Sequence, residues 1–216
     1  MLLSSAVGTG GATDRLVSIS GNLTPLRLSL LANMLTSCGI VTLAALLCSV
    51  LSKQNHIIAL VALGCWLAEA MFLALSQIGT SALIPLSLEF VKAGAPVHSY
   101  YQTLGEFLYS GVYTRGYTFH MWFYCTGRVL WYALFYQSKA VPRVIALFAV
   151  AAVSVGLAGI VFELFGYAVP IFVYLPILPF ELTIGLWLLL GGTPGGSDRP
   201  IQAPAPLGMQ AVSGKP

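Results

Sequence analysis

Charged residues are scarce in this sequence. They make up 8% of the 216 residues, against about 25% in an ordinary soluble domain, whereas 57% of the residues are hydrophobic and the mean hydropathy is +0.86. A soluble protein of this size has too small a core to use that much apolar surface. The composition therefore excludes an ordinary soluble domain and indicates an integral membrane protein, with membrane lipids as its expected partners.

The sequence also lacks runs of like charge. Its 10 Lys and Arg and 7 Asp and Glu are spread thinly along the chain, for a net charge of +3. Nucleic-acid binding needs basic residues gathered on one face or in one segment. We therefore expect no nucleic-acid partner.

Cysteine patterns typical of disulfide frameworks and zinc sites are missing. All four cysteines, Cys38, Cys48, Cys65 and Cys125, fall inside apolar segments, with no CxxC and no Cys/His cluster. We interpret them as small core residues.

Catalytic signatures are missing as well. The sequence contains no GxSxG, HExxH, GxxxxGK[ST] or GxGxxG motif. Its N-terminus has no basic start and too short an apolar stretch for a signal peptide. We therefore predict no catalytic residue and no metal site, and the sequence leaves the cofactor unknown.

Long apolar runs are abundant, and a run of about 20 apolar residues is enough to cross a bilayer as a helix. Five such helices are predicted, over residues 25–51, 56–78, 116–136, 142–165 and 169–190. Prolines at 176 and 179 should divide the last of them. The predicted fold class is all-α, a polytopic transmembrane helix bundle that forms a single domain over residues 24–191.

Three segments lie outside these runs. Residues 1–23 are rich in Gly, Ser and Thr and are predicted to form a flexible leader, and the Gly/Pro-rich residues 192–216 a disordered tail. Residues 79–115 combine charges, prolines and four tyrosines, so we predict short interfacial helices at the headgroup level.

Basic residues near the ends of the predicted helices bear on orientation. Lys53, Lys139 and Arg143 lie on one side, and chiefly Arg27 and Arg115 on the other. Because cytoplasmic loops are enriched in Lys and Arg, this count places the C-terminus in the cytoplasm. The predicted location is the plasma membrane, which is the inner membrane of a bacterial cell.

Three charged residues fall at matching depths in the predicted bundle. At about 1.5 Å per residue, Glu69 and Arg128 each lie roughly 18 Å along their helices, and Glu181 lies about as deep. Each is costly in lipid if unpaired, so we predict a midplane cluster of the three. Two carboxylates and one guanidinium leave one negative charge in excess. Either one Glu is protonated, or a bound cation or proton-bearing ligand completes the site; a purely structural ion pair is the alternative interpretation.

A polar stripe follows the third predicted helix. His120, Tyr124 and Arg128 are spaced i, i+4, i+8 and share one face. His120 should lie near the outer interface, level with Glu163. This pair is consistent with an entry site, a metal site, a pH-sensitive contact or an ordinary interfacial hydrogen bond. A metal needs a third ligand, for which the sequence offers only the distant His98.

Weaker polar residues mark two other helices. Asn33 and Ser37 share a face of the first predicted helix, and Ser76 and Gln77 lie on the second. Such residues usually make hydrogen bonds between membrane helices.

Parts of the sequence resemble a known family. The run LLCSVLSKQNHIIALVALGCWLAEAMFLAL, the helix end FYQSKAVPRVIALFAV and the last helix ELTIGLWLLLGG are similar to the bacterial membrane-protein family called domain of unknown function 4386. The resemblance covers residues 28–192 and implies a membrane helix bundle without implying an activity. Two departures stand out. Family members usually have one more helix before residue 25, and they often carry an arginine where this chain has Trp66, which leaves Arg128 as the basic partner for Glu69.

These observations support three functional hypotheses. The leading one is a non-enzymatic integral membrane protein that binds or relays a small ligand or a proton at Glu69, Arg128 and Glu181. The first alternative is an accessory or structural subunit of a larger membrane complex. The second is an intramembrane lipid-modifying enzyme with Glu69 or Glu181 as general acid or base.

Overall fold

The structure is a computed structural model that describes residue 7, residues 10–96 and residues 98–191. Within these residues the chain is helical, with turns between the helices. The long helices are α3 (Leu23–Leu51), α4 (His56–Lys92), α6 (Arg115–Ser138), α7 (Arg143–Leu164) and α8 (Ile177–Gly191). The short ones are α2 (Ala12–Gly21), α5 (Tyr100–Glu106), the π-helical stretch η1 (Phe107–Thr114) and the 3-10 turn η2 (Ile171–Val173).

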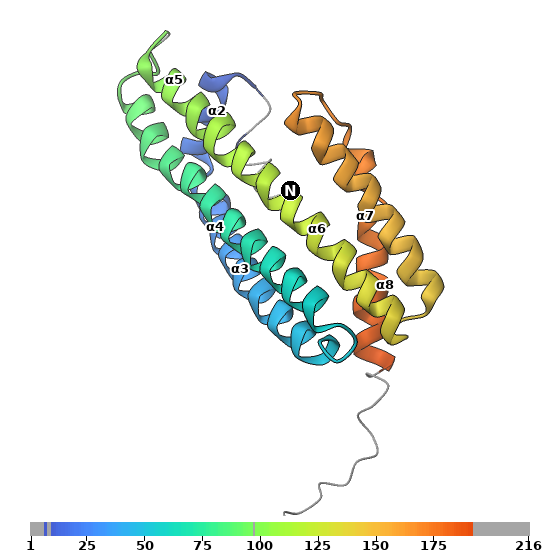
Figure 1. The fold of residues 1–216 in the computed structure, drawn as a ribbon. Helices are drawn as coiled ribbons and strands as arrows, with labels where there is room; N and C mark the ends of the chain where they lie inside the picture. The colour runs from blue at the N-terminus through green and yellow to red at the C-terminus, as the bar shows by residue number, and fades with distance from the viewer. Residues whose placement is uncertain (1–6, 8–9, 97, 192–216) are drawn as a thin grey trace, which may run out of the picture.

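The helices form a bundle with α6 at its centre. Helices α3 and α4 lie on one side of α6, and α7 and α8 lie on the other (Figure 1). The turn at Lys53 and the turn at Lys139 lie at the same end of the bundle, so successive long helices run antiparallel. The main core is built where α4, α6 and α7 meet, around Trp66, Trp131 and Val153.

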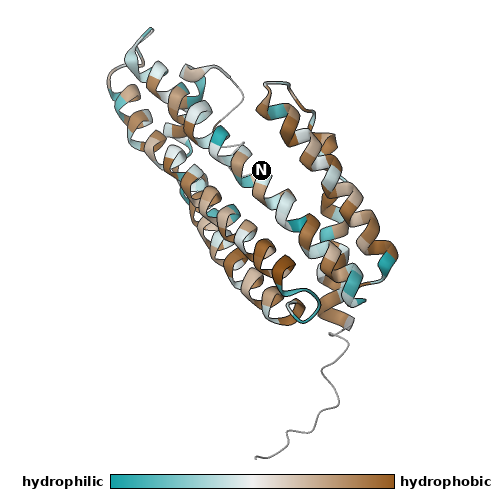
Figure 2. Ribbon diagram, viewed as in Figure 1, coloured by the Kyte–Doolittle hydropathy of each residue, from teal (hydrophilic) through white to brown (hydrophobic). Residues whose placement is uncertain are grey.

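Four stretches of the described chain are long and apolar enough to cross a membrane. They are α3, α4, α7 and residues 171–190. Figure 2 shows hydrophobic residues along much of these helices. The fold class, a transmembrane helix bundle, is thus confirmed. Helix α6 is long enough at 24 residues but less apolar, and its neighbours cover it on both sides. Its role as a fifth span stays a prediction.

Local sequence signals explain several helix ends. The Asn55 side chain accepts a hydrogen bond from the Ile58 amide at 3.1 Å and caps α4. Lys139 ends α6 with a left-handed φ of 57°, and Pro142 directly precedes α7. The predicted break in the last helix lies at Pro176, where η2 and a turn lead into α8.

The structure corrects the prediction of short helices over residues 79–115. Helix α4 continues past Ile78 and through Pro85 to Lys92, and after a turn α5, η1 and α6 form one continuous helix from Tyr100 to Ser138. The intact turns on either side of Pro85 carry the helix across one missing hydrogen bond. These helices of 37 and 39 residues span about 55 Å and 58 Å, against a hydrocarbon core of about 30 Å. The tip of this hairpin therefore extends beyond the hydrocarbon.

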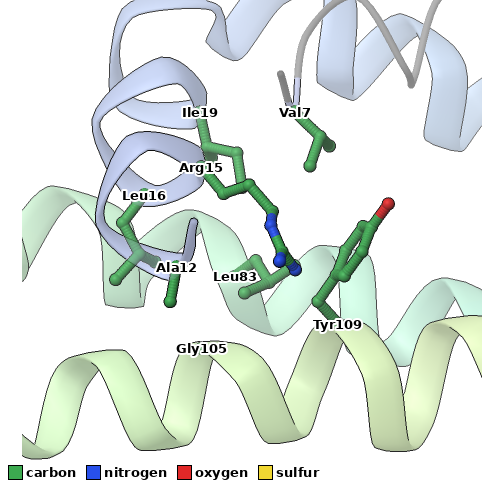
Figure 3. A pocket seen from close by; sticks show the side chains of 8 residues that line it. All are labelled: Val7, Ala12, Arg15, Leu16, Ile19, Leu83, Gly105 and Tyr109. Atoms are coloured by element: carbon green, nitrogen blue, oxygen red, sulfur yellow. The ribbon is translucent and has the colours of Figure 1, made fainter. Parts of the chain in front are cut away.

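The structure also corrects the predicted flexible leader for the described residues before α3. Residues 12–21 form α2, which packs against α4 and α5. Leu16 and Ile19 are fully buried in a small core that includes Leu83, and the Arg15 guanidinium lies 3.1 Å from the Glu106 carboxylate. The cavity between these side chains holds about 10 Å³, room for no more than one water (Figure 3). The predicted disordered tail, 192–216, lies outside the described residues.

Truncation of Leu16 tests the docking of α2. Leu16 is 1% exposed, whereas its neighbour Val17 is 47% exposed. We expect Leu16→Ala to lower the opening free energy of α2 by about 2–5 kcal/mol, because it removes a buried side chain, and Val17→Ala to change it little. Hydrogen exchange of the amides in residues 12–21 measures both effects. Equal protection in the two variants would contradict a docked α2.

Small residues bring α4 close to the η1–α6 helix. A Cβ atom added at Gly79 would lie 2.7 Å from the carbonyl oxygen of Leu108, and one at Gly127 would lie 2.4 Å from the Trp66 ring. On the same interface, a Cβ at Gly116 would lie 2.9 Å from the Ser76 side chain. Close approach of this kind is a common way for membrane helices to associate.

Substitution of Gly79 tests this contact. We expect Gly79→Ala to destabilise the protein by about 1–3 kcal/mol, because the obstructing atom is backbone and cannot turn away. Gly64→Ala, on the same helix, is the matched control, since a Cβ there meets nothing within 4 Å. Thermal unfolding of the purified variants in detergent compares the two. A Gly79→Ala midpoint at or above that of Gly64→Ala would contradict the close contact.

Candidate functional site

An ion pair joins α6 to α8 in the interior of the bundle. The Arg128 Nη2 atom lies 2.9 Å from Glu181 Oε1, and the two side chains are 20% and 23% exposed. The Tyr124 hydroxyl donates a hydrogen bond to the same carboxylate oxygen. Charge-assisted hydrogen bonds of this kind are stronger than neutral ones, so they satisfy much of the hydrogen-bonding need of Glu181.

Aromatic rings surround the Arg128 guanidinium. Its central carbon lies 4.8 Å from the centre of the Trp66 ring and 4.6 Å from that of the Tyr124 ring. Both distances suit cation–π contacts, which gain strength away from water. Arg128 therefore contacts groups from α4, α6 and α8.

Glu69 lies near this pair without joining it. Glu69 is 2% exposed, and its carboxyl group lies within electrostatic reach of Arg128 and Glu181. Among the described residues no ion pair includes Glu69, and its Oε2 atom is buried without a hydrogen-bond partner. The predicted three-residue cluster thus consists of one direct pair and one nearby carboxylate. If both carboxyl groups are ionised, Glu69, Glu181 and Arg128 together still leave one negative charge in excess.

His120 and Glu163, which the sequence predicts at the same depth, do not pair with each other. His120 Nδ1 lies 3.2 Å from the backbone oxygen of Glu69, so the ring faces α4. Glu163 accepts a hydrogen bond of 2.8 Å from the hydroxyl of Tyr174, which follows η2. His98 lies in the turn between α4 and α5, and the part of the chain that the structure describes contains no group of three metal-ligating side chains.

Other predicted contacts are present. The His120 and Tyr124 rings are neighbours, with centres 6.3 Å apart, so the polar stripe on α6 is continuous down to Arg128. Between α3 and α4, the Asn33 amide donates to the Gln77 side chain at 3.1 Å, an interhelical hydrogen bond as predicted.

A cavity of about 500 Å³ lies beside the ion pair. Side chains of α3, α4, α6 and α8 line it, and most of them are apolar. Four lining leucines are exposed, so the cavity opens at the outer surface of the bundle; they are Leu43, Leu178, Leu182 and Leu189. Among the described helices, α7 is the one that the backbone of α8 approaches closely. Between α8 and helices α3 and α6 there is a gap that side chains fill only in part.

Several polar atoms around this cavity are buried and unpaired. They are Arg128 Nε, Trp131 Nε1 and the Tyr132 hydroxyl, from residues that line the cavity. Trp66 Nε1 is also unpaired, but it packs against Gly127 of α6. Buried polar atoms without partners are rare in proteins.

The sequence interpretation missed Trp131 and Tyr132. Both lie in an aromatic stretch that is typical of a packed core, and both are almost fully buried. A signal was present, because Tyr132 extends the stripe of Tyr124 and Arg128 by a further four residues.

A double-mutant cycle tests which carboxylate pairs with Arg128. We expect a coupling of about 0.5–3 kcal/mol between Arg128→Met and Glu181→Leu, because the two side chains are in direct contact. The cycle of Arg128→Met with Glu69→Leu is the control and should show the smaller coupling. For each cycle, reversible unfolding in mixed micelles is measured for the unmodified protein, the two single variants and the double variant. The free energies of unfolding then give the two coupling energies. A larger coupling of Arg128 with Glu69 than with Glu181 would contradict the observed ion pair. It would support the pairing of Arg128 with Glu69 that the sequence suggests.

Comparison with known proteins gives one match. No curated protein and no solved structure matches the chain. The model of a family described as a domain of unknown function, DUF4386, matches residues 1–192. The match includes the segment before α3 and confirms the resemblance noted from the sequence. The chain therefore belongs to the DUF4386 family of domains of unknown function.

Proposed function

We propose that this integral membrane protein binds a small, largely apolar ligand in the cavity beside the Arg128–Glu181 pair. The observation that carries the proposal is the cavity itself. Its volume of about 500 Å³ falls within the usual range of ligand pockets, roughly 300–1,000 Å³, and its apolar wall contains a few polar groups.

The unpaired polar atoms favour a binding site over a purely structural ion pair. A structural pair serves helix packing best when the space around it is filled and its polar atoms are satisfied. Here Arg128 Nε, Trp131 Nε1 and the Tyr132 hydroxyl stay unpaired, at a cost of about 1–3 kcal/mol for each buried group.

The opening of the cavity bears on the route of entry. It lies among exposed leucines of α3 and α8, in a region of the bundle where both helices are apolar. A ligand that partitions into lipid reaches this opening from the bilayer without crossing an aqueous vestibule.

The plasma-membrane location and the cytoplasmic C-terminus stay predictions, as do the subunit and enzyme alternatives.

Tryptophan fluorescence tests occupancy of the cavity. The chain has four tryptophans, and the double variant Trp122→Phe/Trp187→Phe retains only Trp66 and Trp131 beside the cavity. In vesicles of phosphatidylcholine with brominated acyl chains we expect strong quenching, because a chain that enters the cavity brings bromine into contact with the indoles. Vesicles of unbrominated lipid provide the reference intensity.

A variant that fills the cavity completes this test. Gly185 lines the cavity, and a Cβ there meets nothing within 4 Å, so Gly185→Leu has room to occupy the space. We expect this substitution to remove most of the quenching. Gly64→Leu, which lies in open space away from the cavity, is the matched control and should leave it intact. Equal quenching in the two variants would contradict the proposed binding site.

A further inference from the structure

Glu69 of α4 is a buried carboxyl group that no basic side chain of the described chain contacts. It is 2% exposed, and its Oε2 atom has no hydrogen-bond partner among the described residues. The ion pairs found in that part of the chain do not include it. An ionised carboxylate is costly in such a place, and a carboxyl group buried without a partner takes up a proton instead.

The titratable and charged groups that face Glu69 in the described part of the chain come from α4, α6 and α8. They comprise one permanent cation, one further carboxyl group, one imidazole and two thiols. Helix α3 also packs on α4, but its charged residue, Arg27, lies near its start and far from this level. The groups that face Glu69 are Cys65, His120, Cys125, Arg128 and Glu181.

Arg128 can balance one carboxylate, and it already balances Glu181. Its Nη2 atom lies 2.9 Å from Glu181 Oε1. If Glu69 were ionised as well, the three side chains would carry a net negative charge inside an apolar bundle, which is costly. One proton on Glu69 makes the group of three neutral.

His120 is the other side chain that could carry the balancing charge. It is 7% exposed, and its Nδ1 atom lies 3.2 Å from the backbone oxygen of Glu69, a contact that a neutral imidazole satisfies with one N–H group. An imidazolium would add a second N–H group and a second cation within electrostatic reach of Arg128. The carboxyl group of Glu69 is therefore the better proton carrier.

The Arg128 guanidinium lies against α4 as well as α8. Its central carbon is 4.8 Å from the centre of the Trp66 ring, and Trp66 and Glu69 lie one turn apart on α4. Its Nε atom is buried and unpaired, so the guanidinium keeps a donor for a second carboxylate. Arg128 is thus placed to pair with the carboxylate of α8, as observed, or with one on α4.

We infer that Glu69 is a proton-binding site: it holds a proton while Arg128 pairs with Glu181, and it releases that proton to the solvent when it takes Arg128 as its own partner. The proton thereby decides whether Arg128 binds α8 or α4. Because the pair with Glu181 is the main link between α6 and α8, the proton also affects how firmly α8 is held. Proton binding at Glu69 goes beyond ligand binding in the cavity and does not depend on it.

Infrared spectroscopy tests for the proton on Glu69. A neutral carboxylic acid has a C=O stretching band that is separate from the bands of carboxylates and peptide amides, and a maltoside detergent adds no carbonyl band. At neutral pH we expect this band in the unmodified protein and its loss in Glu69→Gln. Glu163→Gln is the matched control and should keep the band, since Glu163 pairs with Tyr174 and not with Arg128.

Two further variants test the exchange of Arg128 between the carboxylates. In Glu181→Gln the guanidinium loses its partner, so we expect Glu69 to ionise and pair with it, and the band to disappear although Glu69 is still present. In Arg128→Met neither carboxyl group has a counterion, so both should hold protons and the band should about double. The double variant Arg128→Met/Glu181→Gln should restore the original band.

Each outcome of the infrared series supports or overturns the inference. Absence of the band from the unmodified protein, or a band of full height in Glu69→Gln, overturns proton binding at Glu69. A band of full height in Glu181→Gln overturns the exchange of Arg128, because burial alone then keeps the proton in place. Both glutamine variants keep the size of the side chain, so they decide the question even if Arg128→Met does not fold.

The two proposals fail in different measurements. Equal bromine quenching in Gly185→Leu and Gly64→Leu overturns ligand binding in the cavity and leaves the proton site standing. Failure of the infrared series overturns the proton site and leaves the cavity untouched, because the quenching is measured without reference to the charge on Glu69.

Discussion

The requirement to shield one arginine inside an apolar helix bundle organises this structure. An unpaired Arg in the middle of a membrane helix costs roughly 2.5–3.5 kcal/mol on insertion scales. Arg128 lowers that cost by an ion pair with Glu181 of α8 and by contacts with the rings of Trp66 and Tyr124. The guanidinium thereby links three helices at one level. Because α8 has little other contact with α6, this link is the main connection between them.

The two sides of α6 are packed in different ways. Toward α4, the residues Gly79, Gly116 and Gly127 allow close approach, and the space is filled. Toward α8, the long side chains of Arg128, Tyr124 and Glu181 bridge a wider gap. Close packing excludes ligands, whereas bridging by long polar side chains leaves space around them. The cavity therefore lies on the α8 side, and the polar atoms that line it belong largely to α6.

That Glu69, Arg128 and Glu181 lie near one another was predictable, and their pairing was not. Counting residues along a helix places Glu69, Arg128 and Glu181 at one level, because the rise per residue is constant. Which of them meet depends on the rotation of each helix about its axis, and helix packing sets that rotation. The same limit explains why His120 and Glu163, which the sequence predicts at one level, face different neighbours. Trp131 and Tyr132 escaped notice because buried aromatic residues in an apolar run look like ordinary core.

The sequence by itself determined the membrane class and the approximate ends of α3 and α7, because hydropathy and helix-capping signals are local properties. Only the tertiary structure decided the partner of Arg128, the docking of α2 on the long hairpin and the existence of the cavity. Each of these depends on contacts between segments far apart in the chain. Such contacts follow from how whole helix surfaces fit together, and no single stretch of sequence contains that information.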